Sequence, residues 1–198
     1  MERPVNSEQL KTHTHKVHVQ LEQTLIPIIQ NIRTQSQYAN LLKIFYTFYS
    51  PIENQLSSVT GIESLTSGIG LRKTDSLRKD ILALKASTDH LALCSDLPTC
   101  TNLSHAFGIM YVLEGSVLGG NAISKMVTKQ LPTEPPPPFS FFLHYGNDAK
   151  IKWQHFKTKL DSNGDLLQSD LFSAATDTFT LFNNWIEKNS TSFVIQTL

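Results

Sequence analysis

The stretch GIMYVLEGSVLGGN, residues 108–121, has the apolar periodicity of a helix but carries glycines inside it. Its apolar residues, and one just beyond it, recur at helical spacing: Ile109, Val112, Leu113, Val117 and Ile123. Each interior glycine costs about 1 kcal/mol of helix stability relative to alanine, so Gly115, Gly119 and Gly120 together forgo about 3 kcal/mol. Gly115 and Gly119 share a face, with Gly108 on the same side two turns earlier. Such a face either packs closely on another helix or lets a flat ligand approach a backbone that can bend there.

The composition of the chain argues against several classes of protein. With 17 basic and 17 acidic side chains in 198 residues, no net charge recruits nucleic acid or an anionic membrane. No apolar run approaches the roughly 20 residues of a membrane-spanning helix, and residues 1–16 lack the apolar core of a secretion signal. Cys94 and Cys100 form no CxxC pair, so neither a disulfide framework nor a zinc site is indicated. We expect a cytoplasmic protein with reduced thiols and neither nucleic-acid nor membrane partners.

The chain is predicted to be all-α, as one domain over residues 1–198, because no stretch shows the two-residue alternation of a strand. Helices are expected from Asn6 or Ser7, over 37–49, from Asp75 or Ser76, from Thr101 or Asn102 to about Lys129, over 148–160 and over 169–188. Pro27 is expected to mark a bend or a new helix start soon after it, and Pro51 to end or kink its helix. The glycines of Gly61–Gly70 predict a loop, and Pro135–Pro138 predicts an extended connector.

The first predicted helix carries a polar row beside its apolar face. This row is Lys11, His15, His18 and Glu22, separated by four, three and four residues. It flanks an apolar row made of Leu10, Thr14, Val17 and Leu21. His18 therefore lies at the border between core and solvent, where an imidazole can face a cavity. The spacing alone also allows a packed or solvated histidine.

Three segments, taken in order, resemble the heme oxygenase family. LKTHTHKVHVQLE, residues 10–22, resembles the first helix of that family. YVLEGSVLGG, residues 111–120, is similar to its distal helix, especially in the bacterial branch often associated with phytochromes. FFLHYGNDAKIKWQHFKTKL, residues 141–160, also resembles that branch. The resemblance implies a helical bundle in which heme is sandwiched between the first helix and a kinked, glycine-rich distal helix.

The resemblance also implies roles for residues on both sides of the heme. His18 matches the histidine that is the axial iron ligand, and Glu22, one turn later, matches a position from which a carboxylate can orient the imidazole ring. Gly115 and Gly119 match the catalytic glycines that let the distal helix pass close over the macrocycle. Ser116 stands where the animal enzymes carry an aspartate that organises water, as in bacterial relatives. A hydroxyl can hold a water molecule but carries no negative charge.

Basic residues match the family positions that bind the heme propionates. Lys11 is one such position, and Lys157 or Lys159 matches a basic cluster on a later helix. Tyr111 is expected to reach a propionate or to pack in the wall, its register being shifted by one residue from the family tyrosine. Three aromatic residues are candidates either for contact with the ring or for the core: Phe141, Phe142 and Trp153.

The resemblance implies oxidative cleavage of heme to biliverdin, ferrous iron and carbon monoxide. The reaction uses O2 and electrons from a separate reductase or ferredoxin-like protein, because the chain has no nucleotide-binding fingerprint. A bacterial phytochrome is a candidate acceptor of the biliverdin. The alternatives are a non-catalytic heme-binding or sensing protein on the same fold, and an all-α protein that binds another small molecule, such as a thiamine-related compound.

Overall fold

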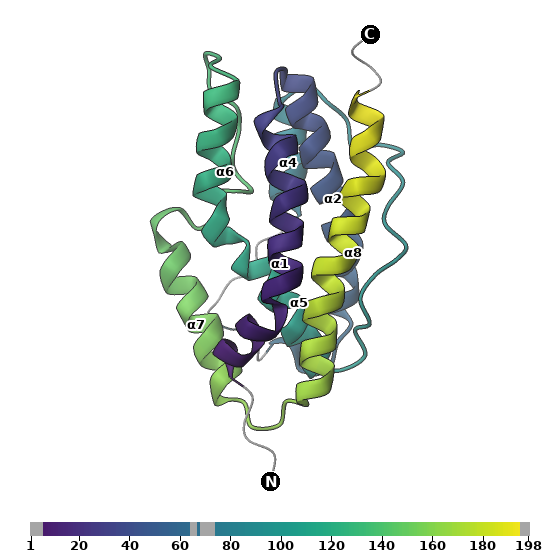
Figure 1. The fold of residues 1–198 in the computed structure, drawn as a ribbon, viewed down its shortest axis with the longest axis vertical. Helices are drawn as coiled ribbons and strands as arrows, with labels where there is room; N and C mark the ends of the chain where they lie inside the picture. The colour runs from purple at the N-terminus through teal and green to yellow at the C-terminus, as the bar shows by residue number, and fades with distance from the viewer. Residues whose placement is uncertain (1–5, 64–66, 68–73, 195–198) are drawn as a thin grey trace.

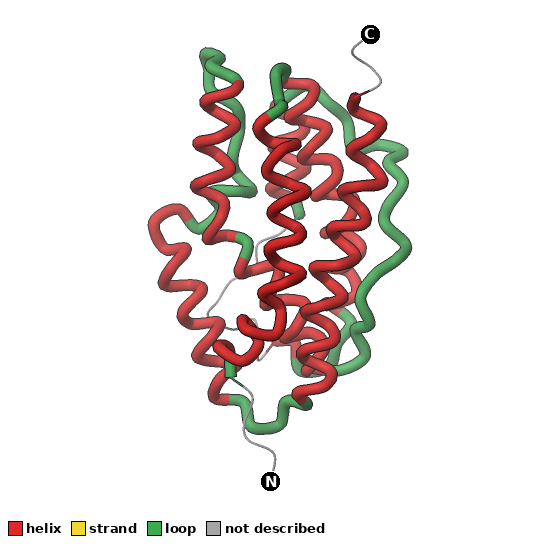
Figure 2. Tube along the Cα trace, in the orientation of Figure 1, coloured by secondary structure: helices red, strands yellow, loops and turns green. Residues whose placement is uncertain are grey.

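The computed structural model describes residues 6–63, 67 and 74–194, and in these residues it contains helices and no strand (Figures 1 and 2). The helices are α1 (Ser7–Gln30), α2 (Gln35–Ser57), α4 (Asp75–Ala83), α5 (Leu103–Gly115), α6 (Val117–Gln130), α7 (Ala149–Ser162) and α8 (Gln168–Val194), with a short 3-10 turn, η1 (Gly146–Asp148). The prediction of an all-α fold is confirmed. Most of the predicted loop Gly61–Gly70 lies outside the described residues.

Helix α8 packs along α1 and α5 (Figure 1). It runs in the same direction as α1, because contacts between the two helices advance together along both chains. Near the start of α1 the ring centroids of His13 and Phe172 are 4.6 Å apart, and near its end Thr24 Oγ1 lies 3.5 Å from Glu187 Oε1. One side of α1 is thereby covered by α8, while α6 and α7 approach it elsewhere.

Side-chain caps fix the starts of two helices where the sequence predicts them. Asn6 accepts a hydrogen bond from the Gln9 backbone N–H at 2.8 Å, and the Gln9 side chain accepts one from the Asn6 backbone at 3.2 Å. Asn102 caps α5 through the backbone N–H of His105 at 2.9 Å. The predicted cap of α4 is wrong, because Asp75 is the first residue inside that helix and Thr74 precedes it. In that first turn the Asp75 carboxylate still stabilises the positive end of the helix dipole.

The two prolines lie inside helices, so of the expected alternatives for Pro51, an end or a kink of its helix, the end is wrong. Pro51 is followed by six more residues of α2, and Pro27 by three of α1. A proline nitrogen cannot donate to the carbonyl four residues earlier, which for Pro51 is that of Thr47. This carbonyl instead accepts a hydrogen bond from the backbone N–H of Cys94 at 2.9 Å. The non-helical connection 85–102, which runs along one side of the molecule, thus replaces the bond that Pro51 removes (Figure 2).

Residues 103–130, which comprise α5 and α6, are together long and apolar enough to cross a membrane. This differs from the expectation that no run of the sequence would be. However, 61% of the most apolar window is buried inside the fold, as in a core helix of a soluble protein. Most of the apolar residues of these two helices are therefore packed inside the fold.

A buried carboxylate anchors the turn that precedes α7. Asp80 on α4 is fully buried and accepts hydrogen bonds from the backbone N–H groups of Ser140 and Phe141, at 3.0 and 2.9 Å. Beside it the Tyr38 hydroxyl donates to the carbonyl of Pro138 at 2.9 Å, which holds the end of the proline-rich connector. Burial, and then the charge of Asp80, raise the pKa of Tyr38, so the phenol stays protonated as this donor. These bonds place Phe142, the next residue of the turn, in the interior.

Replacing the buried carboxylate tests this anchor. We expect Asp80→Ala to lower the free energy of unfolding by about 2 kcal/mol or more, because each buried N–H left without an acceptor costs about 1–3 kcal/mol. Urea unfolding followed by circular dichroism measures the change. Asp165→Ala, at an exposed aspartate, should stay within about 0.5 kcal/mol of wild type. Equal stabilities of the two variants would contradict the anchoring role.

Candidate functional site

A cavity of about 590 Å3 lies between α1, the junction of α5 and α6, α7 and α8. Its size falls within the roughly 300–1,000 Å3 typical of small-molecule sites. The structure brings eight of the residues that the sequence assigned to the site to the wall of this one cavity: Lys11, His18, Glu22, Tyr111, Gly115, Ser116, Gly119 and Lys157. Of the three aromatic candidates, Phe142 and Trp153 line it and Phe141 does not. Side chains of α2 and α8 complete the wall, among them Phe45, Tyr49, Phe179 and Phe182. Apolar periodicity does not separate these aromatic residues from ordinary core residues, so sequence reasoning missed them.

The predicted distal helix is two helices with a break between them. Helix α5 ends at Gly115 and α6 begins at Val117, with Ser116 between them. The Ser116 hydroxyl donates a hydrogen bond to the carbonyl of Leu113 at 2.7 Å, which satisfies a backbone group that the break exposes. The oxygen of this hydroxyl can still accept a hydrogen bond from water in the cavity. The segment is thus not one continuous helix but is interrupted at Ser116, between the two glycines that the sequence singled out.

The glycines of this segment have different neighbours, so the single bare face predicted from the sequence is partly wrong. A side chain at Gly108 would collide with the backbone of α8, and one at Gly120 with the Phe142 carbonyl. Gly108 therefore serves packing and does not line the cavity, because α5 meets α8 at that level. At Gly115 a Cβ would lie 3.2 Å from the indole of Trp153. At Gly119 it would meet nothing within 4 Å, so the open side of the segment is here.

His18 and Glu22 form a pair on the α1 side of the cavity. The Nε2 atom of His18 lies 3.5 Å from Oε1 of Glu22, and both side chains are about half exposed, at 50% and 53%. The imidazole also packs against Phe179, with ring centroids 5.3 Å apart. Glu22 contacts one ring nitrogen, which leaves the other as a possible metal ligand. His15 lines the same cavity one turn earlier on α1.

Tyr111 connects α5 to α1 at the cavity wall. It is nearly buried and shares a hydrogen bond with the side chain of Thr14. The Thr14 hydroxyl also donates to the carbonyl of Leu10 at 2.8 Å. Burial raises the pKa of Tyr111, and the phenol therefore remains protonated near neutral pH. The sequence left open whether this residue reaches a propionate or packs, and its place in the wall is compatible with both.

Two lysines line the cavity from different helices. Lys11 on α1 is largely exposed and lies 3.9 Å from the Glu8 carboxylate, while Lys157 reaches the cavity from α7. Lys159, the alternative to Lys157 in the sequence, is not among the lining residues and donates to the carbonyl of Ser67. Of the two candidates on α7, only Lys157 is therefore placed to meet a ligand in the cavity.

Sequence reasoning missed a buried pair behind the helix break. The carboxylate of Glu114, only 4% exposed, accepts a hydrogen bond from the Tyr145 hydroxyl at 2.8 Å. Tyr145 directly precedes η1 and α7, so this bond ties the start of α7 to the last turn of α5. Both residues lie in the segments that carry the resemblance, but nothing in either segment indicates that they pair.

Comparison with known proteins identifies the family of this chain. A family model described as heme oxygenase matches residues 5–188. The chain belongs to the heme oxygenase family. A heme oxygenase from Xanthomonas campestris pv. campestris (strain 8004) is 27% identical to it over 128 residues, which are 63% of this chain and 72% of that protein. This member of the heme oxygenase family is therefore an oxidoreductase that cleaves heme to biliverdin, ferrous iron and carbon monoxide with O2 and external electrons.

Adjacent glycines of this heme oxygenase provide a matched test of the open face. In the heme-free protein, Gly119→Ala should leave the free energy of unfolding unchanged or raise it by up to about 1 kcal/mol, because the helix gains propensity. Gly120→Ala should lower it by about 1–3 kcal/mol, because the new methyl group collides with the Phe142 carbonyl. Urea unfolding of both variants measures the difference.

The same face can be tested with a larger side chain. Gly119→Leu should weaken hemin binding, measured by absorbance titration, without a comparable loss of stability in the heme-free protein. Normal hemin affinity together with a large loss of stability would mean that Gly119 serves packing.

Proposed function

We propose that heme binds in the cavity between α1 and the α5–α6 break, with His18 as the iron ligand. The observation that carries this proposal is the arrangement of His18 and Gly119 on the wall of one cavity. His18 offers an imidazole nitrogen from α1, and Gly119 on α6 leaves space where any other residue would place a side chain. Imidazole is a normal ligand of heme iron.

The residues of the cavity fit the chemistry of heme. The porphyrin is flat and apolar, and the wall is mainly aliphatic and aromatic, with open space at Gly119. The two propionates are anionic, and Lys11 and Lys157 supply cations from two helices. Tyr111 adds a protonated phenol to the same wall. A ligand that lacked either the apolar body or the anionic groups would use only part of this site.

The residues on the two sides of the heme have separate tasks. Heme supplies the iron at which O2 is reduced, and it is also the substrate. Glu22, whose Oε1 lies 3.5 Å from Nε2 of His18, orients the imidazole. On the distal side, Ser116 holds water through its hydroxyl, and the bare backbone at Gly119 admits O2 without a bulky side chain, whereas the space beside Gly115 is taken by the indole of Trp153. Because Ser116 carries no charge, proton delivery relies on water and backbone groups more than it would with an aspartate.

The remaining partners of the reaction follow from what the chain lacks and from its resemblance. Residues 1–198 act as one heme-oxygenase-like domain in the cytoplasm. Electrons come from a separate reductase or ferredoxin-like protein, because the sequence has no nucleotide-binding fingerprint. A bacterial phytochrome is the proposed acceptor of biliverdin.

Replacement of the proposed ligand tests the iron assignment. We expect His18→Ala to remove the Soret band typical of histidine ligation and to reduce biliverdin formation by more than the roughly 10–100-fold that loss of an outer-shell partner costs. Absorbance spectra of the hemin complex, before and after a reductant is added, measure both effects. Hemin affinity should fall less, because the apolar wall contributes most of the burial. A wild-type complex with the histidine band but no biliverdin would favour a non-catalytic heme-binding protein.

Two other histidines of α1 provide controls. His13 lies against Phe172 and does not line this cavity, so His13→Ala should keep the wild-type spectrum and turnover. His15 does line the cavity and is the rival ligand. If His15→Ala abolishes the histidine band while His18→Ala retains it, the assignment of His18 is wrong.

A further inference from the structure

We propose that Trp153 determines which edge of the heme is cleaved, by fixing the rotation of the macrocycle within the cavity. The inference rests on the proposed function, because it assumes that heme binds between α1 and the α5–α6 break. Trp153 contacts Gly115 at the wall of the cavity. The sequence predicted that the ligand occupies the space left by the absent side chain of Gly115. In the structure the Trp153 indole occupies that space, 3.2 Å from where a Cβ would lie.

The indole of Trp153 is held on three sides. Gly115 lies at its six-membered ring, and Phe156 stacks on it with centroids 5.4 Å apart and an interplanar angle of 11°. Tyr111 packs against it at 5.3 Å and is itself hydrogen-bonded to Thr14. Phe156 is fully buried, in an interior that is close-packed in proteins generally. A ligand that presses on the indole therefore meets a rigid wall.

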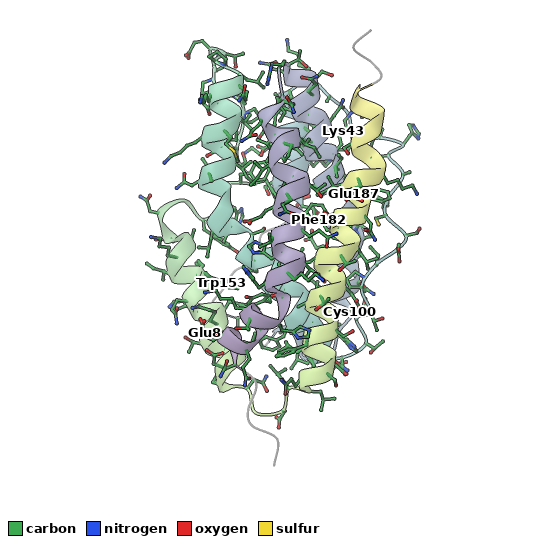
Figure 3. The ribbon with its side chains drawn as sticks, viewed as in Figure 1. Glu8, Lys43, Cys100, Trp153, Phe182 and Glu187 are labelled. Carbon is green, nitrogen blue, oxygen red and sulfur yellow. The ribbon has the colours of Figure 1, made fainter. Side chains whose placement is uncertain are left out.

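Trp153 is in a position to act on a flat ligand. It lines the cavity from α7, and Figure 3 shows it in the space between α7 and α1, which carries His18. Its edge lies directly beside the break at Gly115 and Ser116, where O2 is proposed to react. Rotation of the macrocycle about the axis of the iron bond would drive a different edge of the ring against the indole.

The lysines of the cavity cannot fix this rotation by themselves. Lys11 is largely exposed, and the Lys157 side chain has the same four-carbon stem and several rotamers, so both can follow propionates that shift. They attract the carboxylate edge of heme to one part of the cavity. Trp153, one turn before Lys157 on α7, then limits how far the adjacent edge can turn. The lysines thus determine at which end of the cavity the propionates lie, and the indole determines the rotation of the macrocycle about the iron bond.

The experiment compares Trp153→Ala with wild type in two measurements. Proton NMR of the ferric hemin complex measures the proportions of the macrocycle orientations from the heme methyl resonances. Chromatography of the product measures the proportions of the biliverdin isomers. We expect wild type to show one dominant orientation and one dominant isomer. In Trp153→Ala a second orientation and a second isomer should appear. The ratio of the dominant to the minor species should fall by about tenfold or more, the change expected when a substantial contact is lost.

Matched variants separate the proposed role from general damage. Trp185→Phe removes the other tryptophan, whose Nε1 donates to Thr47 at 3.1 Å and which does not line the cavity, so it should keep one orientation. Trp153→Phe retains an aromatic ring on Phe156 and should give an intermediate ratio. Gly115→Ala leaves the indole in place but crowds it from the distal side, and it should also change the ratio.

The outcomes are distinct. A single, unchanged orientation and isomer in Trp153→Ala would overturn the inference while leaving the proposed function intact. If Trp153→Ala does not fold, unchanged ratios in both Trp153→Phe and Gly115→Ala would overturn it equally. A wild-type protein whose hemin complex lacks the histidine band would instead contradict the proposed function. This outcome is read from the spectrum before any isomer is measured.

Discussion

Close contacts at three glycines hold the α5–α6 segment in place. Gly108 lies against the backbone of α8, Gly115 against the indole on α7, and Gly120 against a carbonyl of the turn before η1. Any larger residue at the first or last of these positions would push the segment away from its neighbour. Because the segment is fixed on these sides, the remaining open side at Gly119 stays turned to the cavity. The helix break at Ser116 is held in the same wall.

The two long walls of the cavity differ in rigidity. On the α5–α6 side the surface joins the backbone at Gly119 to apolar side chains, and the buried pair of Glu114 and Tyr145 ties α5 to the start of α7. On the α1 side, His18 and Glu22 are half exposed and are held mainly by each other and by Phe179. A heme in this cavity would therefore order the α1 side more than the distal side. Heme that binds only the folded chain also stabilises it, by an amount that grows with heme concentration.

Features that depend on one helix could be predicted from the sequence, whereas contacts between distant segments could not. The row that contains His18 was found because its spacing is a property of one helix. The position of Gly108 was misjudged, since helical periodicity gives the face of a residue but not the helix that packs there. Pro51 was expected to end or kink α2, and the distant N–H group that compensates for it leaves no local signal. Asp80 and Glu114 were missed for the same reason, because their partners lie 60 and 31 residues away.

The central claim is that heme lies between His18 and the open side of α6 at Gly119. A crystal structure of the hemin complex tests it most directly. The account predicts a bond between iron and a ring nitrogen of His18, with Glu22 at the other nitrogen, and the opposite face of the macrocycle against Gly119. Iron bound to His15 or to a residue outside this cavity, or a macrocycle that does not touch Gly119, would contradict it.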